Sequence, residues 1–230
     1  MNEQRLDSFS AYAGTSTALR NRVLRNTYWL LAVSMVPTVL GAWVGVSTGI
    51  MAAMGNGLSV ILFLAGAFGF MFAIEKTKES STGVYVLLGF TFFMGLMLSR
   101  MLGMVLGFKN GTSLIMMAFG GTAAVFFTVA SVATVIKRDL SKMGGFLMVG
   151  VIVLILAGLV NMFVQSSALM LTLSVLAIAI FSAFLLYDVK RVIDGGETNY
   201  ISATLAIYLD LYNIFQNLLA LLGIVGGERD

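Results

Sequence analysis

The protein has 230 residues, of which 59% are hydrophobic and 11% are charged, and its formal net charge is +3. Soluble globular domains average about 45–50% apolar and about 25% charged residues, so this composition indicates an integral membrane protein. The chain has no cysteine and no histidine, which excludes disulfides, Cys/His zinc sites, haem-ligating histidines and a histidine general base. The small positive charge is explained by membrane topology, and no nucleic-acid partner is expected.

Seven predominantly apolar runs are long enough to cross a bilayer as helices, which takes about 17 to 25 residues each. Short alternating strands of the outer-membrane type are absent from the sequence, so an all-α membrane domain is predicted over residues 26–225. Residues 1–25 are predicted to be a flexible cytoplasmic tail, and residues 226–230 a short C-terminal tail. The predicted spans are residues 27–46, 53–74, 83–107, 112–136, 144–164, 167–188 and 201–224.

The first three spans contain small residues four positions apart, a spacing that allows close contact between helices in a bilayer. We interpret these motifs as packing seams, and Pro37 in the first span as a kink that neighbouring helices accommodate. The motifs are Gly41-x3-Gly45, Ala65-x3-Gly69 and Gly103-x3-Gly107.

Eleven of the fourteen Lys and Arg residues lie at one end of the predicted bundle. The segments at 48–52 and 165–166, at the other end, carry no charge. The positive-inside rule therefore predicts a cytoplasmic N-terminus and a C-terminus outside. The eleven residues are Arg5, Arg20, Arg22, Arg25, Lys76, Lys78, Lys137, Arg138, Lys142, Lys190 and Arg191.

The last span carries a single charge, Asp210, near the middle of residues 201–225. A carboxylate at such a depth costs about 2.5 to 3.5 kcal/mol on insertion scales. At about 100° per residue, Asp210 shares a narrow stripe with small and polar residues, so this side is predicted to face the bundle interior. The stripe is Ala203, Ala206, Asp210, Asn213 and Asn217, and opposite it lie Ile201, Leu205, Tyr208, Tyr212, Phe215 and Leu219, expected to face lipid or other helices.

A second carboxylate, Asp188, is predicted to lie at a similar depth. Gly195-Gly196 breaks the chain between the last two spans, and the midpoint of Asp188 and Asp210 is position 199, just beyond this break. Two carboxylates that meet in a low-dielectric site cannot both ionise cheaply, so they would share a proton and titrate as a pair. The ionised pair would attract Ca²⁺ only transiently, because Ca²⁺ takes about six to eight oxygen ligands.

Two simpler interpretations stay open. Asp188 is near the end of its span and would form a solvated pair with Arg191 at i+3. Asp210 would then have a purely structural, hydrogen-bonding role. Arg100 lies close enough to the end of its own span to reach the interface with its long side chain.

Several pieces of the chain, together covering residues 20–224, resemble the Bax inhibitor family (transmembrane BAX inhibitor motif), in its bacterial YccA-like branch. The most specific piece is the long C-terminal one, which contains both aspartates. The pieces are "VLRNTYWLL" at 23–31, "FGGTAAVFF" at 119–127, "KRDLSKMGGFLMVGVIV" at 137–153, "YDVKRVIDGGETNYISATLAIYLDLYNIF" at 187–215 and "LLALLGI" at 218–224.

The resemblance implies six helices around a central, more polar seventh, and a pH-sensitive calcium leak with a di-aspartyl site at Asp188 and Asp210. Asn213 and Asn217 would continue the ion pathway, with Ca²⁺ as the permeant ion and no cofactor. Family members with the leak have a basic latch near the end of the second helix. Here Lys76 and Lys78 replace the expected arginine, and Arg191 is a further candidate. Lysine is a poorer bidentate partner for carboxylates than arginine.

Three functions follow as alternatives. The first is a pH-gated cation leak in the bacterial inner membrane. The second, also implied by the resemblance, is a non-transporting modulator of the membrane protease FtsH. The third is an intramembrane aspartyl protease, but the Gly-x-Gly-Asp motif of such enzymes is absent around Asp210, where the sequence is "IYLD". An enzymatic activity is therefore not expected.

Overall fold

The structure is a computed structural model that describes residues 3–228, apart from the side chains of residues 3–17 and of Asn56. All regular secondary structure in this range is helical. Seven of the helices are long and apolar enough to cross a membrane, which confirms the seven predicted spans. The helices are α1 (Glu3–Thr48), α2 (Ile50–Ala53), α3 (Asn56–Thr77), α4 (Ser81–Leu106), α5 (Gly111–Val135), α6 (Met143–Val164), α7 (Ser167–Ile193) and α8 (Tyr200–Gly226).

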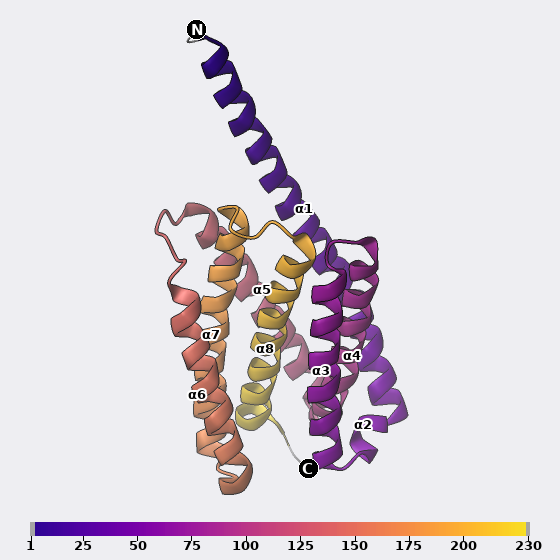
Figure 1. Ribbon diagram of the computed structural model, residues 1–230. Coiled ribbons are helices and arrows are strands. Elements are labelled where there is room, and N and C mark those ends of the chain that lie inside the picture. The colour runs from indigo at the N-terminus through magenta and orange to yellow at the C-terminus, as the bar shows by residue number, and fades with distance from the viewer. Residues whose placement is uncertain (1–2, 229–230) are drawn as a thin grey trace.

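The long helices run up and down between two ends of the bundle (Figure 1). We call the end from which α1 projects the basic end; its loops are residues 78–80, 136–142 and 194–199. The opposite, far end contains residues 49–55, 107–110 and 165–166 and the end of α8. The loops thus alternate as the lysine and arginine pattern predicts. The assignment of the basic end to the cytoplasm stays a prediction.

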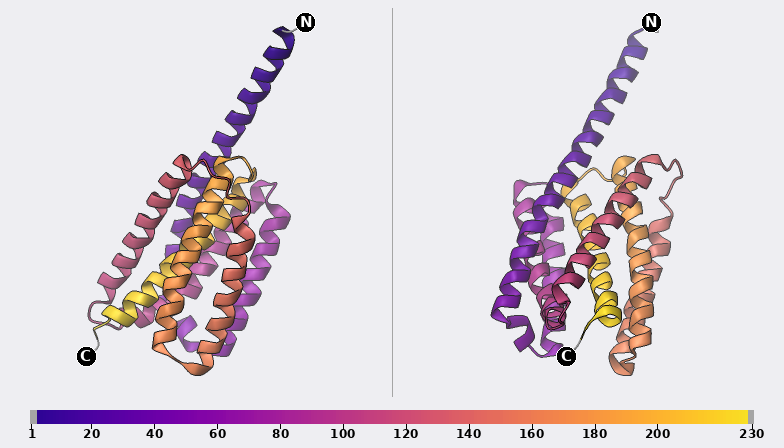
Figure 2. Two further views of the ribbon diagram at one scale, coloured as in Figure 1. Left: turned by 90° about the vertical axis from the view of Figure 1, so that its left-hand side faces the viewer. Right: turned by 180° about the vertical axis from the view of Figure 1, so that it is seen from behind.

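The seventh span, α8, lies inside the bundle. It contacts α1, α3, α4, α5 and α7, whereas α6 packs on α7 at the periphery (Figure 2). Side chains on several sides of α8 are buried, including Ile201, Ile207, Tyr212 and Leu219. The predicted central position of the last span is therefore confirmed.

The first span is longer than predicted, because α1 begins at Glu3 and projects beyond the basic end (Figure 1). Residues 3–25, expected as a tail, are thus helical; they contain no proline, and alanine, leucine and arginine in this segment favour helix. The flexibility of the tail stays a prediction. Pro37 lies inside α1, which continues through it. The short helix α2 was not predicted and lies in the segment that follows α1.

Glycines bring α1 and α4 into close contact. A Cβ atom on Gly41 would collide with the carbonyl oxygen of Phe92, and one on Gly95 would collide with that of Thr38. This confirms the packing role of Gly41. Gly45, four residues later in the same motif, packs directly against the side chain of Ser99. Among the described residues, the other two motifs make no such seam. Positions Gly69 and Gly103 have no neighbouring atom within 4 Å of an added Cβ. Their spacing alone does not reveal that these faces are open.

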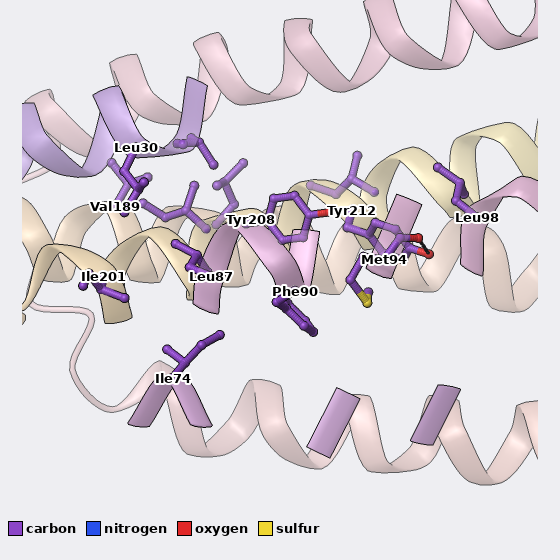
Figure 3. Close-up of a cluster of buried hydrophobic side chains, with 14 of the residues drawn as sticks. Leu30, Ile74, Leu87, Phe90, Met94, Leu98, Val189, Ile201, Tyr208 and Tyr212 are labelled. Carbon is purple, nitrogen blue, oxygen red and sulfur yellow. Dashed lines mark hydrogen bonds between the residues drawn. The ribbon is translucent and has the colours of Figure 1, made fainter. Parts of the chain in front are cut away.

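The largest buried cluster joins α8 to α1, α4 and α7, with Ile74 contributed by α3 (Figure 3). Phe90 and Tyr208 meet edge to face within it, with ring centroids 6.2 Å apart. Because lipid chains are as apolar as these side chains, close packing and hydrogen bonds stabilise the assembly more than the hydrophobic effect does. The cluster fixes α8 between its neighbours and so sets the depth of Asp210.

Candidate functional site

The hairpin between α7 and α8 sets the geometry of the candidate site. Helix α7 ends at Ile193, and Gly195 follows with φ 79°, a left-handed conformation that glycine adopts without a steric cost. Helix α8 then begins at Tyr200, where the Asn199 side chain accepts hydrogen bonds from the backbone N–H groups of Ile201 and Ser202. The predicted break at Gly195-Gly196 is therefore confirmed.

Asn199 also ties this hairpin to the neighbouring loop. Its amide nitrogen donates to the carbonyl oxygen of Lys78 over 2.9 Å and to Glu79 Oε1 over 3.2 Å. One side chain thus caps α8 and anchors the α7–α8 loop to the α3–α4 loop. The sequence signal for the cap is an asparagine directly before an apolar run, and the sequence analysis missed it.

The structure brings Asp188 and Asp210 together across the hairpin. The two side chains lie close enough to interact directly, Asp188 from α7 and Asp210 from α8. Asp210 is 5% exposed and Asp188 is half-buried. Position 199, the midpoint of the pair in sequence, is the residue that caps α8. This is why residues equidistant from it lie at matching depth in the antiparallel hairpin.

Asp210 has an unsatisfied oxygen. Its Oδ2 atom is buried and has no hydrogen-bond partner, and the only other such side-chain atom among the described residues is Thr27 Oγ1 on α1. A buried acceptor without a partner costs about 1–3 kcal/mol, and more when it is charged. Such an atom in a folded protein points to a bound proton, water or ion that satisfies it. Of these two atoms, Asp210 Oδ2 belongs to the group that can carry a charge, so its burial has the larger cost.

The chain matches the family model described as inhibitor of apoptosis-promoting Bax1 over residues 20–227. The chain belongs to the Bax inhibitor family. It is 38% identical to the Escherichia coli (strain K12) protein named modulator of FtsH protease YccA, over 93% of this chain and 95% of that protein. An uncharacterised protein of Pseudomonas aeruginosa is 37% identical over 99% of this chain and all of its own length. An uncharacterised membrane protein of Vibrio cholerae is 38% identical over 90% of this chain and 92% of its own.

The three cations proposed as a latch in this Bax inhibitor family member are engaged outside the aspartate pair. Lys78 Nζ donates to Glu75 Oε1 over 2.6 Å, and this hydrogen bond raises the pKa of Lys78. Lys76 lies over the ring of Phe72, with Nζ 5.5 Å from its centroid. Neither interaction brings Lys76 or Lys78 to the aspartates in this conformation.

Of the three latch candidates, Arg191 is the one whose charge acts on Asp188. It forms an ion pair with Glu197 over 3.4 Å, and its Nε donates to the Gly196 carbonyl oxygen. Its charge nevertheless acts on Asp188, as does that of Glu197 with the opposite sign. Among the described residues, Arg191 near the end of α7 thus pairs with Glu197 of the following loop and forms no ion pair with Asp188.

The two asparagines of the predicted pathway are partly buried, and both bond to their own helix. Asn213 Nδ2 donates to the Leu209 carbonyl oxygen and Asn217 Nδ2 to that of Asn213, each over 2.8 Å. These bonds fix the nitrogen end of each amide on α8. The oxygen ends are then the parts of the side chains available to an ion or to water.

Sequence reasoning missed the role of the opposite side of α8. The Tyr208 hydroxyl lies 2.9 Å from Thr38 Oγ1 on α1. The Tyr212 hydroxyl donates to the Met94 carbonyl oxygen on α4 over 3.3 Å, and Figure 3 labels both of these residues. Periodicity placed these tyrosines opposite Asp210 but left open whether lipid or protein covers them. Their hydroxyl groups were the available signal, because a buried tyrosine usually finds a hydrogen-bond partner.

Two carboxylates, those of Asp188 and Asp210, are the charged ligands that the site provides for a cation. Among the described residues, no group of three or more acidic, histidine or cysteine side chains is arranged to hold a metal ion. Ca²⁺ takes about six to eight oxygens, so Asp188 and Asp210 would need carbonyl groups and water to complete its coordination. The arrangement suits brief contact with a passing ion better than tight binding.

Proposed function

We propose that this protein is a pH-sensitive cation leak of the bacterial inner membrane, with Asp188 and Asp210 as its gate. The observation that carries this proposal is the buried Oδ2 atom of Asp210, which has no hydrogen-bond partner among the described residues and lies beside a second carboxyl group. A structural aspartate would be expected to use both oxygens in hydrogen bonds. An aspartate that must respond to a proton or an ion is expected to leave one open.

The gate would work through the charge on the pair. With one shared proton, Asp188 and Asp210 carry a single negative charge and are joined by a hydrogen bond between α7 and α8. When that proton leaves, two like charges face each other in a buried site. Separation of the helices, entry of water or arrival of a cation would then lower the free energy. The protonation state thus selects between two arrangements of the hairpin.

The ion pathway would continue along α8 through Asn213 and Asn217. Both side chains lie on the Asp210 side of the helix, one and two turns further toward the far end. Their amide oxygens and the two carboxylates are hard ligands, which suit Ca²⁺ better than soft metals. Ca²⁺ is therefore the permeant ion that we propose.

The test is Ca²⁺ flux into liposomes that contain the purified protein, measured between about pH 5 and 8, the range open to perturbed carboxylates. The wild type should conduct in a pH-dependent manner, and Asp188→Asn and Asp210→Asn should each change that dependence. Asp194→Asn is the matched control, because Asp194 follows α7 but is exposed and paired with Lys190. Flux equal to that of empty liposomes at every pH would refute the proposal.

A second candidate function is modulation of the membrane protease FtsH. It is favoured by the 38% identity to the Escherichia coli modulator of FtsH protease YccA. The helical extension of α1 beyond the basic end would give a partner a surface outside the bilayer (Figure 1). FtsH should co-purify from native membranes, and deletion of the gene should change the turnover of its membrane substrates. Normal turnover after deletion would contradict this function, whatever the outcome of the flux assay.

A further inference from the structure

Helix α8 is held in place by hydrogen bonds at both of its ends and along its length. At the basic end, Asn199 caps the helix and bonds to the α3–α4 loop. At the far end, the Asn110 side chain donates to the Gly226 carbonyl oxygen over 2.6 Å and accepts from the backbone N–H of Glu228. Three side chains of α8 between these ends bond to α1 or α4: Thr204, Tyr208 and Tyr212. A shift of α8 would break these bonds inside the bilayer, where no water replaces them.

Helices α6 and α7 contact the rest of the bundle mainly through apolar side chains. In the part of the chain that the structure describes, their side chains form hydrogen bonds and ion pairs only within the two helices, in the turn between them or with the loop that follows α7. Asp188 is the exception, because it interacts directly with Asp210 of α8. The α7 side chains buried in the main cluster, Leu185 and Val189, are apolar. Lipid chains can replace such contacts at little cost, since they are as apolar as leucine.

Helices α6 and α7 pack tightly on each other. A Cβ atom on Gly144 would lie 2.9 Å from the Tyr187 ring. One on Gly150 would lie 3.0 Å from the Ile180 side chain, so at both positions glycine lets the two helices approach closely. At the far end, the Ser166 side chain caps α7 directly after the turn. Among the described residues, α7 is the only helix with which α6 makes extensive contact (Figure 2). We call residues 143–193 the α6–α7 unit.

Both chain connections of the α6–α7 unit lie at the basic end. Residues 136–142 precede it and residues 194–199 follow it, and neither segment is helical. The second contains Gly195 and Gly196, and glycine permits large changes of the backbone torsion angles. Hinges in proteins are a few such loop residues. The turn at the far end has, within the described chain, hydrogen bonds only to α6 and α7. The unit can therefore turn about the basic end and open at the far end.

We propose that loss of the shared proton turns the α6–α7 unit outward at the far end while α8 stays in place. Two like charges on Asp188 and Asp210 repel each other across the α7–α8 contact, and α8 is the helix that its hydrogen bonds hold. In the described chain, the other charges that act on the pair are those of Arg191 and Glu197, on the unit and in its loop. The motion uncovers the side of α8 that carries Asp210 and Asn217. This inference rests on the proposed function, for which it names the part that moves.

The test is a set of distances between pairs of spin labels on the full-length protein in lipid nanodiscs, measured at about pH 5 and about pH 8. Labels attach only at introduced cysteines, because the chain has none of its own. Trp43 on α1, Phe163 on α6 and Val225 on α8 are exposed positions near the far end. From the lower to the higher pH, the distance between Trp43→Cys and Phe163→Cys should lengthen by about 2 to 5 Å, the size of helix shifts in switching proteins. The distance between Trp43→Cys and Val225→Cys should stay constant.

Asp210→Asn should abolish the lengthening at Phe163, whereas Asp194→Asn, the matched control, should keep it. A constant distance from Trp43 to Phe163, a change of equal size at Val225, or a lengthening that persists in Asp210→Asn would overturn the proposal. Lengthening without Ca²⁺ flux would refute the leak and leave the moving unit. Flux with a constant distance would refute the moving unit and leave the leak.

The rigidity of the α6–α7 unit has its own test. Phe146 on α6 and Val175 on α7 are exposed, and the distance between labels at these two positions should not change with pH. Gly150→Leu drives α6 away from Ile180 and should lengthen this distance. Gly158→Leu is the matched control and should not, because an added Cβ there meets no atom within 4 Å. A pH-dependent distance without either glycine substitution, or equal distances in the two glycine variants, would overturn the assignment of α6 and α7 to one unit.

Discussion

The two sides of α8 treat buried polar groups in opposite ways. On the tyrosine side, Tyr208 and Tyr212 reach α1 and α4 with hydroxyl groups that all find partners. On the aspartate side, the amide nitrogens of Asn213 and Asn217 each donate one hydrogen bond to a carbonyl oxygen of α8 itself. One oxygen of Asp210 has no hydrogen-bond partner among the described residues. Satisfied polar groups hold a fold in place, whereas an unsatisfied one marks a place where something must bind or change. The comparison separates the structural side of α8 from the proposed functional side.

The largest expected effect on stability is on the tyrosine side. Tyr208 is 1% exposed and packs against Phe90, so Tyr208→Ala should lower the free energy of unfolding by about 3–5 kcal/mol, as for other large buried aromatics. Thermal unfolding in detergent measures this loss. The pH dependence of ion flux in whatever folded protein remains should match wild type. A stability loss below that of Asp210→Asn would contradict the assignment of the two sides.

Loss of the Asn199 cap should have the next largest effect on the free energy of unfolding, because this cap fixes the position of α8 relative to α7. Asn199→Ala removes the cap of α8 and the bonds to the α3–α4 loop, which should cost about 0.5–2 kcal/mol. Asn199→Asp keeps the capping oxygen and loses the amide donor, so it should recover part of the loss. If both variants unfold like wild type, the loop contact contributes nothing to the position of the hairpin.

A single hydroxyl should matter less. Tyr212→Phe removes the hydrogen bond to the Met94 carbonyl oxygen and keeps the ring, so the loss should be about 0.6 kcal/mol, the average for such bonds in a membrane protein. Chemical unfolding in mixed micelles is the suitable measurement. A loss of several kcal/mol would mean that the hydroxyl belongs to a larger polar network than the structure contains.

The asparagines should have the smallest effect on stability and a clear effect on transport. Asn217→Ala and Asn213→Ala each remove a bond within one helix, which should change the free energy of unfolding by no more than about 0.5 kcal/mol. Their flux at a fixed pH should nevertheless fall, since an oxygen ligand is lost from the proposed pathway. Unchanged flux in both variants would confine the pathway to the aspartates.

Hydropathy and the hairpin symmetry were enough to predict the seven spans and the meeting of Asp188 with Asp210. Both depend on local length and on depth in the membrane, which the sequence encodes directly. The helical extension of α1 was not predicted, because residues 3–25 lack an apolar pattern and their helix-favouring composition was the only signal. The partners of Tyr208 could not be predicted, because they depend on which helix lies alongside. The open faces at Gly69 and Gly103 are likewise set by tertiary packing. The unpartnered oxygen of Asp210 needs the positions of all surrounding atoms.

The most direct test compares one polar group from each side of α8 in the same assay. Ca²⁺ flux into liposomes is measured across pH for wild type, Asp210→Asn and Tyr208→Phe, with the amount of inserted protein matched. The account predicts that Tyr208→Phe keeps the pH dependence of the wild type and that Asp210→Asn loses it. A pH dependence that survives in Asp210→Asn, or that disappears in Tyr208→Phe alone, would contradict the assignment of the gate to the aspartate pair.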